Sequence, residues 1–250
     1  MNPRNPLDAI GPPSVRDALT TLRDALVRDA GERISGLVLW GDLAAGHHAA
    51  GRTRVSVAVI LRDTSPATLT AIAPALRAAY RQAQVEPLLL RADEVSAAAD
   101  VFPSKFLDIK ARNVVLHGED PFAALTIDPR ALRFRTEQEL RNLALRLRRR
   151  IVDGHGDATE AWRALREISG AVGLALHMAL TVLDGGAPAP HALPELLDAA
   201  SSALGLDPAA LRPLAQAGGG EPNASPAALL AAVLHAVEVA TARVDALEAP

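Results

Sequence analysis

The chain has 250 residues, of which 49% are hydrophobic and only 3% aromatic, and it carries a formal net charge of -3. It contains no cysteine, which excludes disulfides, thiolate metal sites and cysteine nucleophiles. The slightly acidic balance does not favour nucleic-acid binding. The N-terminus has no apolar leader and no run is expected to be long enough to span a membrane, so we expect a cytoplasmic protein without a membrane partner. The strong preference for Arg over Lys indicates a GC-rich bacterial genome.

The first half of the chain alternates between helical and strand patterns, which is typical of an α/β layer structure. Ser14 is expected to cap the first helix, and Ser65 and Pro66 mark the start of another. Runs of β-branched and aliphatic residues bounded by Gly and polar clusters predict strands. The expected strands are 34–40, 55–61, 85–91 and 114–117, and the expected helices are 15–30, 66–84, 92–99 and 103–112.

The second half has no strand pattern and predicts a bundle of about five helices. Its segment Thr159–Leu183 is apolar nearly all round, so we expect it to be the most buried helix. The change in pattern places the division at 1–127 for the α/β domain and 128–250 for the helical bundle. The expected helices are 132–152, 159–183, 191–204, 208–217 and 225–247.

The stretch from Ile34 to Leu61 organises the first domain, because it reads as a strand, a Gly41-Asp42 turn, a loop and a second strand. In layout it resembles the active-site segment of polymerase-β-like nucleotidyltransferases, in which a Gly-Ser turn is followed by a strand carrying Asp-x-Asp. The later run Val114–Pro121 looks like the closing part of minimal nucleotidyltransferase domains. A helical bundle after such a domain is similar to kanamycin nucleotidyltransferase-like proteins.

The resemblance implies a mixed sheet with helices, and chemistry in which Mg²⁺ ions stabilise an anionic transition state. The acids that hold those ions are missing here, because Arg54 and Ser56 stand at the Asp-x-Asp positions. Asp42 replaces the Ser of the turn and brings a negative charge that opposes phosphate. Glu86 stands where the third carboxylate of the family would lie. The catalytic motif is therefore degenerate, at positions Arg54, Ser56 and Glu86, and we expect no metal site and no cofactor.

An anion such as a nucleotide is the expected ligand of this region. Gly41 and Asp42 are a candidate remnant of a phosphate loop, although a plain strand-ending turn explains them as well. The second feature is a small cationic patch of His47, His48, Arg52 and Arg54, although a solvated loop explains these residues as well. The candidate ligand-binding residues are Gly41, Asp42, His47, His48, Arg52 and Arg54.

Other polar motifs are better explained by ordinary structure. The Arg-rich run from Arg141 to Arg150 lacks interleaved aromatics and predicts a solvated helix face. The Arg150–His155 spacing matches a ribonuclease-like motif of helical modules, but the glycines on either side of His155 place it in a loop. His177 lies in an apolar helix and is expected to be a core or interface residue.

Three functions remain open on the sequence. The leading one is a catalytically impaired nucleotidyltransferase-like protein, a pseudoenzyme that acts as a binding or assembly module, with a protein partner or a homodimer. The alternative is an active nucleotidyltransferase that modifies a small molecule or a protein and uses Mg²⁺. The third is a structural partner in a toxin–antitoxin-like pair.

Overall fold

The structure is a computed structural model that describes residues 7, 10–46, 55–186, 189–190, 192–217, 220 and 222–247. The chain divides into two compact units, Met1–Ile127 and Asp128–Pro250. Each unit has its own hydrophobic core, and each is described by itself below.

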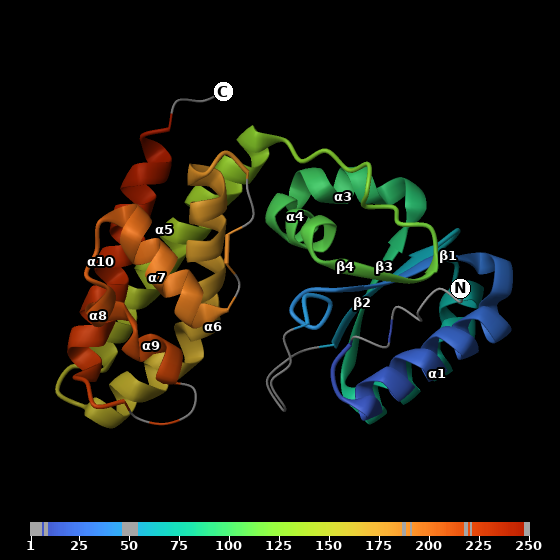
Figure 1. Cartoon of the computed structure of the whole chain (residues 1–250), viewed down its shortest axis with the longest axis horizontal. Coiled ribbons are helices and arrows are strands. Elements are labelled where there is room, and N and C mark those ends of the chain that lie inside the picture. The colour runs from blue at the N-terminus through green and yellow to red at the C-terminus, as the bar shows by residue number, and fades with distance from the viewer. Residues whose placement is uncertain are drawn as a thin grey trace, which may run out of the picture. The chain divides into compact units, whose positions relative to one another are not determined.

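The described strands of the first unit form one mixed sheet (Figure 1). In the order β3-β2-β1-β4, the central strand β1 is antiparallel to both neighbours, while β2 and β3 run parallel. The prediction that 34–40 and 55–61 are neighbouring strands is confirmed. The strands are β1 (Ile34–Trp40), β2 (Val55–Leu61), β3 (Val85–Arg91) and β4 (Asn113–Gly118).

Helices cover both faces of the sheet, which explains why its central strands read as continuous apolar runs. Side chains such as Leu37 and Val57 pack toward α1 and α2, whereas Val38, Ala58 and Ile60 pack toward α3 and α4 on the opposite face. Figure 1 shows α1 and the pair α3 and α4 on opposite sides of the strands. The helices are α1 (Pro13–Ala30), α2 (Pro66–Ala83), α3 (Val95–Val101) and α4 (Pro103–Ala111), with short 3-10 turns at Gly31–Arg33 and Ala92–Glu94.

The two predicted helix starts have different outcomes. The helix α2 begins at Pro66 as predicted, and Ser65 caps it, since its side chain accepts a hydrogen bond from the backbone N–H of Thr68. The prediction that Ser14 caps α1 is wrong, because the helix begins at Pro13 and its cap position is Pro12. Pro13 has no N–H to satisfy and its fixed φ suits a first helical turn, so no side-chain cap is required.

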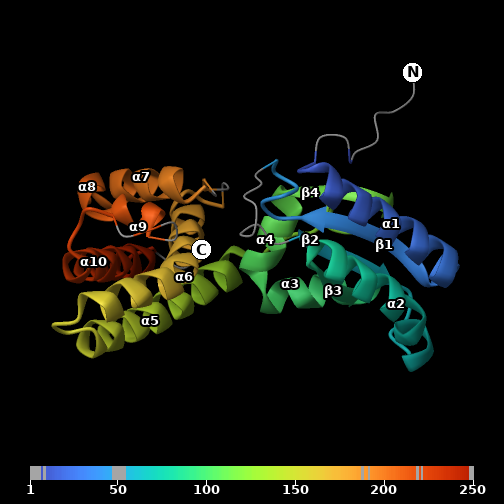
Figure 2. The ribbon, with the colours of Figure 1, turned by 90° about the horizontal axis from the view of Figure 1, so that it is seen from below.

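The second unit is a helical bundle, and no strand occurs in the described parts of 128–247. The helices α5, α6 and α10 pack against one another, and α7 lies on the side of α6 and α10 away from α5 (Figure 2). The expected helix 208–217 is two short helices, because Pro213 cannot continue the backbone hydrogen bonding of the first. The helices are α5 (Pro129–Asp153), α6 (Ala158–Leu183), α7 (Leu193–Leu204), α8 (Pro208–Leu211), α9 (Pro213–Gln216) and α10 (Pro226–Asp245).

The helix α6 supplies more buried residues than any other described helix, as the sequence predicted. Its apolar surface is not covered on every side, however, since Leu174 is 56% exposed. The expectation that no run is long enough for a membrane span is also wrong, because α6 and α10 both reach that length and hydropathy. Both helices line the core of the bundle, and this burial accounts for their apolar composition.

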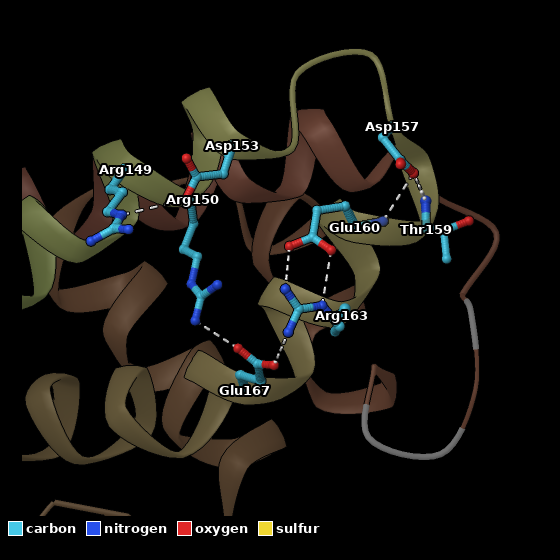
Figure 3. Close-up of polar contacts among 8 residues, drawn as sticks. All are labelled: Arg149, Arg150, Asp153, Asp157, Thr159, Glu160, Arg163 and Glu167. Atoms are coloured by element: carbon cyan, nitrogen blue, oxygen red, sulfur yellow. Dashed lines mark hydrogen bonds and ion pairs between the residues drawn. The ribbon is translucent and has the colours of Figure 1, made fainter.

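A network of charged side chains holds the corner between α5 and α6 (Figure 3). Asp157 caps α6 by accepting hydrogen bonds from the N–H groups of Thr159 and Glu160. Glu167 then joins the two helices, with Arg150 of α5 at 2.7 Å and Arg163 of α6 at 2.7 Å.

The Arg-rich run of α5 pairs largely with acids. Arg141 contacts Glu137 and Asp245, and Arg148 contacts Glu238 on α10. These pairs make the run a solvated, charge-balanced helix face, as the sequence predicted.

Candidate functional site

The register of the sheet brings the sequence-predicted positions of β2 and β3 together. Ser56 lies opposite Glu86 on β3 and opposite Trp40 on β1, and Trp40 in turn lies opposite Asn113 on β4. Residues directly opposite each other share a face of the sheet. This row therefore faces α3 and α4, the same side as Ala58, at the end of the sheet where β1 turns at Gly41.

The turn after β1 depends on glycine. Gly41 has φ +83, a left-handed conformation that L side chains rarely adopt. Its N–H donates to the backbone carbonyl of Arg112 at 3.0 Å, which ties the turn to the segment between α4 and β4. Because this N–H already has a protein acceptor, it does not face outward as a donor for a phosphate.

Asp42, the next residue of the turn, is held by an arginine. The Nη1 of Arg112 donates to Oδ1 of Asp42 at 2.7 Å. On its other side, the same guanidinium donates to Asp108 through Nε at 2.7 Å and through Nη2. The Arg112 side chain is only 13% exposed and Asp108 20%, whereas Asp42 is 57% exposed. The negative charge of this turn is therefore paired with Arg112, which Asp42 shares with Asp108. The expectation that Asp42 opposes phosphate stays a prediction.

Neighbouring polar groups fix the position of this pair in the fold. Asn113 donates from Nδ2 to the carbonyl of Ile109 at 3.0 Å, which binds the start of β4 to the end of α4. Asp120 accepts the N–H of Phe122 at 2.8 Å, and the Phe122 ring packs on Phe106 of α4 at a centroid distance of 6.1 Å. The segment carrying Arg112 is thus anchored on both sides.

Several predicted ligand-binding residues lie outside the described residues, so their positions stay predictions. They are His47, His48, Arg52 and Arg54. Of the predicted site, the structure places Gly41, Asp42, Ser56 and Glu86, and these four lie at one end of the sheet.

The residues in the row do not fit the pair of Mg²⁺ ions that the fold family implies. Ser56 offers a hydroxyl, Trp40 an indole and Glu86 one carboxylate, whereas a site for two hard cations needs several converging carboxylates. In the part of the chain that the structure describes, no group of three or more His, Asp or Glu side chains is placed to hold a metal ion. The side chains of this row therefore support no catalytic step that runs through a metal.

The sequence interpretation missed Arg112 and Asp108 as members of this region. A signal for their mutual contact was present, because an acid four residues before an arginine on a helix forms a favourable pair. Nothing in the sequence indicated the contact between Arg112 and Asp42, which are separated by 70 residues. Only the antiparallel pairing of β1 with β4 brings the two together.

Comparison with known proteins supports the fold. No protein-family model matches the chain, and no curated protein matches its sequence. Among solved structures, it is similar to the spectinomycin adenyltransferase AAD(9) of Enterococcus faecialis, crystallised with ATP and spectinomycin. The TM-score is 0.57 at 11% identity, over 92% of this chain and 98% of that one. At this identity the likeness shows the fold alone, and the fold of this chain is nucleotidyltransferase-like.

Proposed function

We propose that this protein is a catalytically impaired nucleotidyltransferase-like protein, which binds an anionic ligand at the Gly41 end of its sheet and acts as a binding or assembly module. One observation carries the proposal. The row in which the fold family needs converging acids holds Ser56 between Trp40 and Glu86, so it offers a single carboxylate. By sequence, Arg54 adds a positive charge two residues earlier.

The charge argument favours binding over transfer. An arginine beside a divalent cation is repelled at short range, and the repulsion grows where water is partly excluded. The same arginine attracts a phosphate or carboxylate without any metal. A nucleotide is the first ligand to test, because the structurally similar adenyltransferase was crystallised with ATP.

Active transfer is the second candidate, and one observation favours it. The likeness covers 98% of the adenyltransferase, so both units take part in it, the α/β unit and the helical bundle together. A transferase of this kind would move the adenylyl group of ATP to a hydroxyl of a small molecule, with cleavage of the bond between the α- and β-phosphates and release of pyrophosphate. It would require acids that lie elsewhere than the row described above.

Two measurements on the wild-type protein separate the candidates. Calorimetric titration with each nucleoside triphosphate, with and without Mg²⁺, is expected to show binding that does not depend on the metal. An adenylyl-transfer assay with ATP and spectinomycin is expected to show no product. Nucleotide binding that requires Mg²⁺ and disappears in Glu86→Ala would contradict the proposal and make the enzyme the leading function.

A further inference from the structure

We infer that Arg112 is an anion-binding side chain of the candidate site, in addition to Arg54, and that Asp42 covers it as an internal competitor. This inference rests on the proposed function, and it names the group that meets the ligand. The anion it would take is a phosphate or pyrophosphate group, because a guanidinium fork matches the oxygens of a phosphate in geometry and charge.

Arg112 is already fixed in position before any ligand binds. Its side chain is only 13% exposed, and its Nε and Nη2 donate hydrogen bonds to the carboxylate of Asp108. Asp108 lies four residues earlier, at the end of α4, so this contact is built into the helix. An arginine fixed in this way loses little conformational freedom when it binds a ligand, which removes part of the usual entropic cost.

Arg112 makes fewer hydrogen bonds to Asp42 than to Asp108. Asp42 makes one bond to Nη1, at 2.7 Å, and its side chain is 57% exposed. Asp42 is the exposed partner of this pair, so water solvates its carboxylate once it leaves the guanidinium, while Arg112 keeps its contacts with Asp108. A dianion arriving at the turn can therefore take the place of Asp42 on Nη1, and the released carboxylate remains hydrated at the surface.

The turn after β1 does not depend on the Asp42 side chain. Gly41 provides the left-handed residue, and its N–H is bonded to the carbonyl of Arg112. The backbone that carries Arg112 and the turn thus stays joined when the Asp42 carboxylate moves away. We call the contact between Asp42 and Arg112 the latch, because the Asp42 carboxylate occupies the guanidinium until an anion takes its place.

Calorimetry with pyrophosphate in the absence of metal tests the latch. Asp42→Asn removes the competing charge and keeps the shape of the side chain, so it is expected to tighten pyrophosphate binding about tenfold relative to the wild type. Arg112→Lys keeps the positive charge but loses the fork, and it is expected to weaken binding about tenfold.

A double-mutant cycle separates the latch from general electrostatics. In the Arg112→Lys background, Asp42→Asn is expected to change affinity by less than about twofold, because the two side chains act as a unit. The matched control is Asp93→Asn, which removes the acid of the exposed Arg91–Asp93 pair in the same unit. This control is expected to leave pyrophosphate affinity unchanged.

Three results would overturn the inference: unchanged or weaker binding in Asp42→Asn, an equal gain from Asp42→Asn in the Arg112→Lys background, or no pyrophosphate binding in either the wild type or Asp42→Asn. If Arg112→Lys fails to fold, the comparison of Asp42→Asn with Asp93→Asn still decides. The proposed function fails on a different result, namely Mg²⁺-dependent nucleotide transfer by the wild type, which the metal-free titration does not measure.

Discussion

At the scale of single residues, the backbone around the sheet depends on glycine where a side chain has no room. Gly118 ends β4 with φ +74, and a Cβ built there would lie 2.0 Å from the backbone oxygen of Ser35 on the neighbouring strand. Gly156 has a similar φ of +79, but nothing lies within 4 Å of its would-be Cβ. The two positions therefore separate backbone strain from steric conflict.

Alanine at these glycines tests that distinction. Gly118→Ala is expected to destabilise the protein by more than about 3 kcal/mol, because the backbone of β1 must shift in addition to the left-handed strain. Gly156→Ala carries only the strain and is expected to cost about 1–2 kcal/mol. Urea unfolding of both variants beside the wild type is the measurement, and equal losses would show that the contact with Ser35 is relieved at no cost.

A carboxylate at the start of α2 gives a pH-dependent contribution to stability. The side chain of Ser65 lowers the pKa of Asp63 most, and the carboxylate also accepts hydrogen bonds from the N–H of Ser65 and the hydroxyl of Thr68. Together these groups lower the pKa of Asp63 to about 2 from a usual value of 3.8. A group with a lowered folded-state pKa stabilises the fold above its unfolded pKa, and this contribution disappears as the pH falls through the folded value.

We therefore expect part of the stability of the first unit to fall away between about pH 4 and pH 2. Asp63→Asn should lower the free energy of unfolding near neutral pH and reduce its fall between about pH 4 and pH 2. Thermal unfolding of the two proteins across that range measures the difference, with Asp24→Asn as a control for loss of a surface charge. An equal loss of stability on acidification in Asp63→Asn and in the wild type would rule out the Asp63 carboxylate as the cause of that loss.

At the scale of elements, α6 combines a buried face with one exposed apolar position. Leu176 is fully buried among the bundle helices, whereas Leu174 is 56% exposed on the same helix. Leu176→Ala is expected to cost about 2–5 kcal/mol, since it removes buried methyl groups and leaves a cavity. Leu174→Ala is expected to stay within about 0.5 kcal/mol of the wild type.

Chemical denaturation followed by circular dichroism checks this pair of leucines. A large loss in Leu174→Ala would mean that Leu174 is covered in solution, for example in a dimer, and the loss would then depend on protein concentration.

The edge strand β3 carries features that limit pairing with another chain. Pro87 has no N–H, and the N–H of Arg91 donates to the side chain of Glu94 at 2.9 Å instead of to a strand. Proline and capped donors are the usual means by which natural sheets protect an exposed edge. Edge-to-edge association through β3 is accordingly disfavoured.

At the scale of the whole molecule, the fold is similar to that of an enzyme family, but the sequence lacks the acids on which the chemistry of that family depends. The fold is nucleotidyltransferase-like, while the sequence resemblance puts Arg54 and Ser56 at the positions where that family carries its Asp-x-Asp acids. We expect the double change Arg54→Asp with Ser56→Asp to raise the affinity for Mg²⁺ or Mn²⁺, because two acids at i and i+2 of a strand point to one face.

Calorimetric titration with Mn²⁺ measures this gain against the wild type. The conservative double change Arg54→Gln with Ser56→Asn removes the positive charge without adding ligands, and it is expected to bind the metal no better than the wild type. An equal gain in both double variants would show that removing the arginine, and not restoring the acids, is what matters.

Much of the fold followed from the sequence, because the spacing of apolar residues is a local signal. The runs at 34–40 and 55–61 predicted adjacent strands, and the change of pattern near residue 128 predicted a helical bundle. The nucleotidyltransferase-like fold is confirmed by the structural likeness. The ligand-binding role of Gly41, Asp42 and the loop that follows stays a prediction.

What the tertiary structure alone decided concerns contacts between distant segments. The charge of Asp42 was plain in the sequence, but its ion pair with Arg112 was not, because two side chains 70 residues apart meet only after β1 and β4 have paired. Likewise, a helix of continuous apolar composition cannot reveal which side stays in solvent, as Leu174 does. Local patterns determine which elements form, and packing of the elements determines which charges and surfaces remain available.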